Sequence, residues 1–385
     1  MTTLCYRCAL RLRRIATYSD SLPNAARAFS TIPARQRQSS IPTFTPTPST
    51  PLLDTLLADL RAKHLIPSAL RTPDRRLIFG TKNRQLLADN PRSTQIGSEV
   101  IPLQWMDRRS EIPRRATMFN QALEHMVNSE GGEAWKNLAP LLKGMGDCRP
   151  GDKRDALSEE TLGKVVRKAG MKGQFGTILL CLQQVENTGL SLKYPAVLQN
   201  VMRALREHAT REGWSVEAVA KSRKWAAQVA GLLEMEAHGG GTYMKGAKDA
   251  RRRPEVLGVF LELAAVDAFK HKGGKDVDGQ VKMYTERLLG CIGDKAQPAS
   301  LPPSKKGPQL EMLYGLPIYH GLLLAERILQ QDLPQPQLAR KIREDYEAGL
   351  TILADALEAR GDGAQGKEMT YGGQALKAWG SVVRD

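Results

Sequence analysis

The stretch SEETLGKVVRKA (residues 158–169) decides the fold class, because its apolar residues recur at the three- and four-residue spacing of a helix. Ser158 followed by two glutamates predicts the start of that helix, since a serine caps free amides and acids complement the helix dipole. The apolar pattern returns 36 residues later: Leu162, Val165, Val166 and Ala169 align with Leu198, Val201, Met202 and Leu205. The sequence therefore predicts two related helices with a further helix between them.

The same kind of pattern extends over most of the chain beyond residue 114. Alternating strand patterns are nearly absent there, and glycines 170, 189, 239 and 361 are predicted to end helices. We predict helices over residues 115–128, 133–144, 158–169, 174–188, 194–210, 215–237, 255–270, 277–292, 309–329, 337–360 and 374–383. The fold class is all-α, as an irregular helical bundle or a helical-hairpin solenoid preceded by an extended N-terminal arm.

Residues 158–210 resemble the pentatricopeptide class of helical hairpins, whose repeats have a comparable length. The resemblance implies hairpins that stack on one another. It rests on the 36-residue offset of apolar positions, so an irregular arrangement of helices stays open as the alternative.

The first 50 residues contain seven arginines, no lysine and one acid, with many serines, threonines and alanines. This composition is typical of a mitochondrial presequence, and no apolar core of a secretory signal is present. Residues 27–30, RAFS, resemble a presequence cleavage motif, and we predict cleavage after Phe29. Removal of residues 1–29, with five arginines and one aspartate, leaves a net charge of +11. A disordered basic tail is the alternative interpretation.

The predicted organisation has five parts. A presequence (1–29) and a Pro/Ser/Thr-rich linker (30–50) precede a short helix and extended arm (51–113). In that arm, RRLIFG (75–80) and SEVIPLQW (98–105) are predicted to be extended, with little helix beyond 82–88. A repeat-like helical domain (114–300) and a C-terminal helical region (301–385) follow.

Catalytic and metal-binding motifs are not found in the sequence. Gly241 and Gly246 have the spacing of a phosphate-binding loop, but Ala247 stands where that motif requires lysine. The six histidines have no His or Cys partner at ligand spacing. The longest apolar runs are far shorter than the roughly 18 residues of a membrane span. We predict no enzymatic activity, no cofactor, no metal and no transmembrane segment.

Basic side chains recur at helix ends and turns, where they could contact RNA phosphates. The alternative for each group is a solvated charged surface. The predicted phosphate-binding residues are Lys164, Arg167, Lys168, Lys245, Lys248, Arg251, Arg252 and Arg253.

The predicted presequence, basic charge and helical body together resemble mitochondrial gene-expression proteins, including ribosomal components and translation or RNA-processing factors. That resemblance implies a mitochondrial matrix protein whose partners are mitochondrial rRNA or mRNA and ribosomal proteins. Two alternatives stay open: a non-catalytic, protein-binding assembly or accessory factor for a mitochondrial complex, and peripheral contact with the inner membrane through the same charges.

Overall fold

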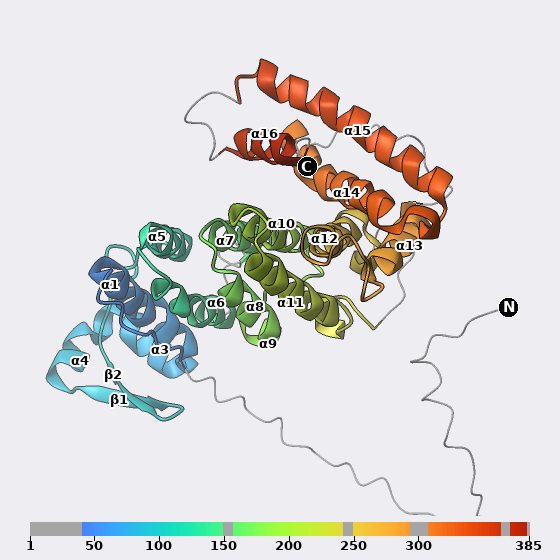
Figure 1. The fold of residues 1–385 in the computed structure, drawn as a ribbon. Coiled ribbons are helices and arrows are strands. Elements are labelled where there is room, and N and C mark those ends of the chain that lie inside the picture. The colour runs from blue at the N-terminus through green and yellow to red at the C-terminus, as the bar shows by residue number, and fades with distance from the viewer. Residues whose placement is uncertain (1–40, 149–156, 242–248, 293–306, 363–369, 383–385) are drawn as a thin grey trace, which may run out of the picture. The chain divides into compact units, whose positions relative to one another are not determined.

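The described part of the computed structural model comprises residues 41–148, 157–241, 249–292, 307–362 and 370–382, and it is built of helices and one β-hairpin (Figure 1). The predicted all-α class is confirmed. The N-terminal elements are α1 (Pro51–Leu60), the π-helix η2 (Arg61–Leu65), α2 (Ile66–Ala69), α3 (Thr72–Phe79), the 3₁₀-helix η3 (Thr81–Asn83), α4 (Arg84–Asp89), β1 (Arg92–Ile96) and β2 (Glu99–Leu103).

The central elements are α5 (Arg115–Asn128), η4 (Ala134–Asn137), α6 (Leu138–Asp147), α7 (Glu159–Met171), α8 (Phe175–Gln183), α9 (Val185–Thr188), α10 (Pro195–Arg211), α11 (Val216–Leu233), η5 (Glu236–His238), η7 (Ala250–Arg252), α12 (Pro254–Val266), the π-helix η8 (Asp267–His271) and α13 (Gln280–Ile292). The C-terminal elements are α14 (Pro308–Leu329), η10 (Gln330–Asp332), α15 (Pro336–Ala359) and α16 (Tyr371–Val382). The predicted presequence and residues 30–40 lie outside the described residues.

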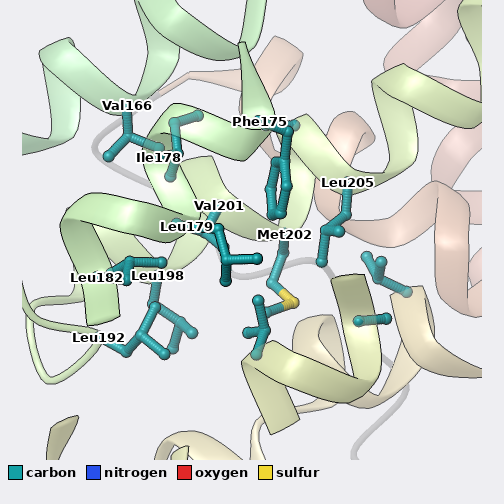
Figure 2. Close-up of a cluster of buried hydrophobic side chains, with 14 of the residues drawn as sticks. Val166, Phe175, Ile178, Leu179, Leu182, Leu192, Leu198, Val201, Met202 and Leu205 are labelled. Atoms are coloured by element: carbon teal, nitrogen blue, oxygen red, sulfur yellow. The ribbon is translucent and has the colours of Figure 1, made fainter. Parts of the chain in front are cut away.

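The two stretches that align at an offset of 36 residues form α7 and α10, and these helices pack against each other. Figure 2 shows Val166 of α7, Ile178 of α8 and Val201 of α10 in one cluster of buried side chains. These side chains are at most 1% exposed, so the apolar pattern of the sequence reports a real core.

Helix pairs follow one another in the packing. After α7 and α10, helix α10 contacts α12, α12 contacts α14, and α14 contacts α15 and α16 (Figure 1). Helix α8, which follows α7, also contacts α11, which follows α10. This order agrees with successive helical hairpins, while membership of the pentatricopeptide class stays a prediction.

Glycines allow close approach of neighbouring helices. A Cβ atom added to Gly170 of α7 would lie 2.7 Å from Cβ of Ala204 of α10, and one added to Gly258 of α12 would lie 2.5 Å from Cγ1 of Ile318 of α14. Carbon atoms normally stay about 3.5 to 4 Å apart. The two interfaces therefore have no room for a side chain at these glycines.

Two of the predicted helix ends at glycine are confirmed. Gly189 and Gly361 have φ angles of 69° and 70° and follow α9 and α15 in the left-handed region that favours glycine. The helix predicted over 215–237 instead ends at Leu233 of α11, and Gly239, with φ of 91°, follows the short 3₁₀-helix η5. The predicted end at Gly170 is wrong, because α7 continues to Met171. Gly173, with φ of 72°, is the glycine that turns the chain there.

Residues 70–114, called the N-terminal module below, differ from the predicted extended arm. Residues 75–79 belong to helix α3, because Ile78 turns inward and joins a small core with Leu70, Leu87 and Leu103. The extended prediction for 98–105 is confirmed by β2, which pairs antiparallel with β1 around a turn at Gly97. The domain boundaries at 113 and 300 stay predictions.

Candidate nucleic-acid interface

Helix α7 carries one of the two predicted phosphate-binding groups. It begins where the sequence predicts, since the backbone amide of Thr161 donates to Ser158 Oγ at 3.2 Å. Lys164 and Lys168 are one turn apart and lie on one side of the helix. Both reach α5: Lys168 forms an ion pair with Glu124, and Lys164 Nζ lies 3.5 Å from the side-chain oxygen of Asn120.

The ion pair with Glu124 neutralises the positive charge of Lys168. Its hydrogen bond is the largest of the effects that lower the pKa of Glu124, so this carboxylate stays charged and keeps its partner. Lys168 is 14% exposed, which leaves little of its ammonium for another ligand. Lys168 therefore joins α5 to α7.

Arg167 is placed differently. Its guanidinium lies 5.3 Å from the ring centre of Tyr371, the first residue of α16, and Arg203 of α10 lies 4.5 Å from the same ring. Arg203 is buried and bonded to Glu207 and Gln374. Among the residues that the structure describes, Arg167 has no carboxylate within ion-pairing distance. It can thus meet an external anion without breaking an ion pair within the chain.

A cavity of about 320 Å³ adjoins this aromatic contact, between α10, α14 and α16. Arg211 and Lys377 lie on its walls together with Glu207 and apolar side chains. Arg211 also donates to the backbone oxygens of Gly170 and Met171, at 3.3 and 3.0 Å, and so caps the last turn of α7. This cavity was not predictable from the sequence, because its lining residues come from segments far apart in the chain.

Beneath the cavity lies a fully buried polar cluster. Arg206 makes two hydrogen bonds to Glu262, at 2.7 and 2.9 Å, and His320 Nδ1 lies 2.8 Å from the same carboxylate. Burial would raise the pKa of Glu262, but the charge of Arg206 and the bonds from both partners hold it below its ordinary value. Glu262 is therefore a buried carboxylate anion that holds α10, α12 and α14 together.

The second predicted group is largely neutralised within the chain. Arg251 donates to both carboxylate oxygens of Asp249, at 2.9 and 2.7 Å, and to Glu234 at 2.8 Å. These bonds raise the pKa of Arg251, and its hydrogen bond is the largest effect that lowers the pKa of Asp249. Arg253 lies 3.5 Å from Glu255.

The other members of this group are Arg252, Lys245 and Lys248. Arg252 is half-buried in η7, and Lys245 and Lys248 lie outside the described residues. The two predicted groups are not brought together in one site. Helix α7 carries one, and the arginines of the other, called the α12 group below, lie just before α12; α10 packs against both helices (Figure 1).

The described ranges contain no helix long and apolar enough to cross a membrane. In the same ranges, no three His, Cys, Asp or Glu side chains are grouped so that they could hold a metal ion.

Comparison with known proteins gives a consistent result. A family model described as mitochondrial ribosomal protein mS27 matches residues 27–380. The chain is also similar to the small ribosomal subunit protein mS27 of Neurospora crassa, with 28% identity over 282 residues that cover 68% of this chain and 67% of that protein. The family match spans far more than half of the chain and confirms the predicted mitochondrial ribosomal type. The chain belongs to the mitochondrial ribosomal protein mS27 family.

Proposed function

We propose that this protein is a non-catalytic constituent of the small subunit of the mitochondrial ribosome, located in the matrix and in contact with RNA. The observation that carries the proposal is the family match over residues 27–380. The name of the Neurospora relative supports the assignment to the small subunit. The net charge of +11 expected after removal of residues 1–29 favours a polyanionic partner.

Phosphate contact at α7 is assigned first to Arg167. A guanidinium can donate two parallel hydrogen bonds to one phosphate, and the ring of Tyr371 supports its other side. Lys164 is half-buried and makes one long contact to Asn120, so a phosphate can compete for its ammonium. Lys168 keeps α5 in place next to this pair.

The roles within residues 245–253 divide between anchoring and binding. Arg251 anchors the chain through Asp249 and Glu234, and Arg253 is held next to Glu255. For Lys245, Lys248 and Arg252, phosphate contact is proposed from the basic sequence alone.

Sedimentation of mitochondrial lysate tests the proposal. The wild-type chain is expected to migrate with the small ribosomal subunit and to stay there at high salt, as a constituent does. Migration apart from ribosomal subunits, and unchanged by RNase, would overturn the proposal and favour a protein-binding accessory factor.

A charge reversal tests the α7 contact. The double change Lys164→Glu and Arg167→Glu is expected to weaken association with the small subunit, because it places two negative charges against phosphate. Lys224→Glu with Lys221→Glu on α11 is the matched control, with the same change in net charge at two exposed lysines. Equal association of both double variants would refute the α7 contact.

A further inference from the structure

The net charge of the described residues is concentrated in the N-terminal module. Residues 70–114 contain nine arginines and lysines and five aspartates and glutamates, a net charge of +4. All other described residues together contain thirty of each sign and are neutral. The α7 and α12 groups are thus balanced by acids in the rest of the described chain, and the N-terminal module is not.

Four exposed cations of the N-terminal module have no carboxylate partner among the described residues. No ion pair within the described ranges involves the exposed side chains of Arg71, Arg76, Lys82 and Arg92. One of the acids of the module is engaged elsewhere, since Glu99 pairs with Arg61 of η2. Solvent and mobile ions therefore balance these positive charges in the isolated protein.

Two further arginines of the module lie over aromatic rings. The guanidinium of Arg84 is 5.0 Å from the ring centre of Trp105, and that of Arg108 is 5.4 Å from the ring centre of Phe79. Both arginines are exposed, so each keeps surface available to a ligand. Guanidinium groups both stack on unpaired RNA bases and donate hydrogen bonds to phosphates. Lysine has no planar group to stack and interacts with phosphate as a point charge.

The module holds these side chains on a fixed framework. Trp105 Nε1 donates to the backbone oxygen of Gly80 at 3.0 Å, and the amide of Met106 donates to the oxygen of Ile78 at 3.0 Å. These bonds tie the segment after β2 to the end of α3. The cations on α3, α4 and the hairpin are therefore positioned by one small core before any ligand arrives.

We propose that the N-terminal module is a second RNA-binding surface, separate from the residues of α7. Its phosphate contacts are made by Arg71, Arg76, Lys82 and Arg92. Arg84, which lies over Trp105, stacks on a base. The inference rests on the proposed function in taking RNA as the partner. RNA is favoured over an acidic protein or an anionic membrane because the guanidinium groups of Arg84 and Arg108 lie over aromatic rings, and a planar guanidinium held in this way can stack on a base.

Fluorescence anisotropy of the chain from residue 30 with a labelled RNA stem-loop tests this surface. The fourfold change of Arg71, Arg76, Lys82 and Arg92 to glutamine is expected to reduce the slope of log affinity against log salt by about 3. The matched control changes four exposed cations outside the module to glutamine, with the same loss of charge: Lys282, Arg340, Lys341 and Arg360. The control is expected to keep the slope within about 1 of the wild type.

Arg84→Lys separates stacking from charge. The variant keeps the positive charge, so the salt slope is expected to stay the same while affinity falls about fivefold or more through loss of the planar group. An unchanged affinity would contradict the stacking role of Arg84.

Competition identifies the class of partner. Unlabelled RNA is expected to displace the labelled stem-loop better than polyglutamate or cardiolipin vesicles at equal negative charge. A fourfold variant with the slope of its control, or better displacement by either competitor, would overturn the RNA surface. If the fourfold variant binds RNA as the wild type does while both sediment with the small subunit, this inference fails and the proposed function stands.

Discussion

Replacement of Gly170 by alanine tests the close contact between α7 and α10. The new Cβ would lie 2.7 Å from Cβ of Ala204, so the two helices must separate by about 1 Å at this turn. Overpacking of this kind lowers the free energy of unfolding by about 1 to 3 kcal/mol, and the better helix propensity of alanine raises it by about 1 kcal/mol. We expect the free energy of unfolding to fall by up to about 2 kcal/mol.

Urea unfolding followed by circular dichroism measures this change, with Gly231→Ala as the matched control. Gly231 lies in α11, and a Cβ there would meet no atom within 4 Å, so the control is expected to gain up to about 1 kcal/mol. Ala204→Gly should restore the space, so the double variant should be more stable than the sum of the two single effects by about 1 kcal/mol. A stabilisation by Gly170→Ala equal to that of the control would refute the close contact.

Three further predictions concern charged and titrating groups. Glu262→Gln leaves the buried guanidinium of Arg206 without its anion. The free energy of unfolding should fall by about 3 kcal/mol or more in the same urea assay. A loss below about 1 kcal/mol would contradict the buried pair. Burial lowers the pKa of His238, so the unfolded chain binds more protons below about pH 6.5 and stability should fall there by up to about 1.4 kcal/mol per pH unit. In urea midpoints at pH 7.5, 6.5 and 5.5, His238→Gln should show a shallower fall, and equal slopes would exclude this role. Arg251→Gln removes the guanidinium that pairs with the buried Asp249 and should lower the free energy of unfolding by about 1 to 3 kcal/mol. RNA affinity measured by anisotropy should stay unchanged. A loss of RNA affinity at unchanged stability would instead assign Arg251 to RNA contact.

Elements with a long apolar period were predictable from the sequence. The pattern from Leu162 to Leu205 placed α7 and α10 correctly, because the positions that repeat every three or four residues are those that become buried. Residues 75–79 were misassigned because their run of apolar residues is too short to show a period. Gly170 was misassigned because a glycine required for close packing has the same appearance in sequence as one required for a turn.

The candidate site was less predictable than the fold. Sequence composition locates cations, but it does not show which carboxylates neutralise them. Arg251 and Asp249 are neighbours whose bond could be suspected, whereas Arg206 and Glu262 are 56 residues apart and meet through the packing of α10 on α12. The excess charge of the N-terminal module can be counted on the sequence, whereas the lack of carboxylate partners for Arg71, Arg76, Lys82 and Arg92 is a property of the folded chain.

The contact of α16 with α7 and α10 has a consequence for how the chain folds. Most helices pack on neighbours that were synthesised shortly before them, and such contacts form early. Tyr371 instead lies beneath Arg167 and Arg203, and Gln374 bonds to Arg203 across 171 residues. A chain emerging from its N-terminus can therefore assemble its earlier helices while Arg203 has only its local partner Glu207, and α16 adds Tyr371 and Gln374 when it emerges.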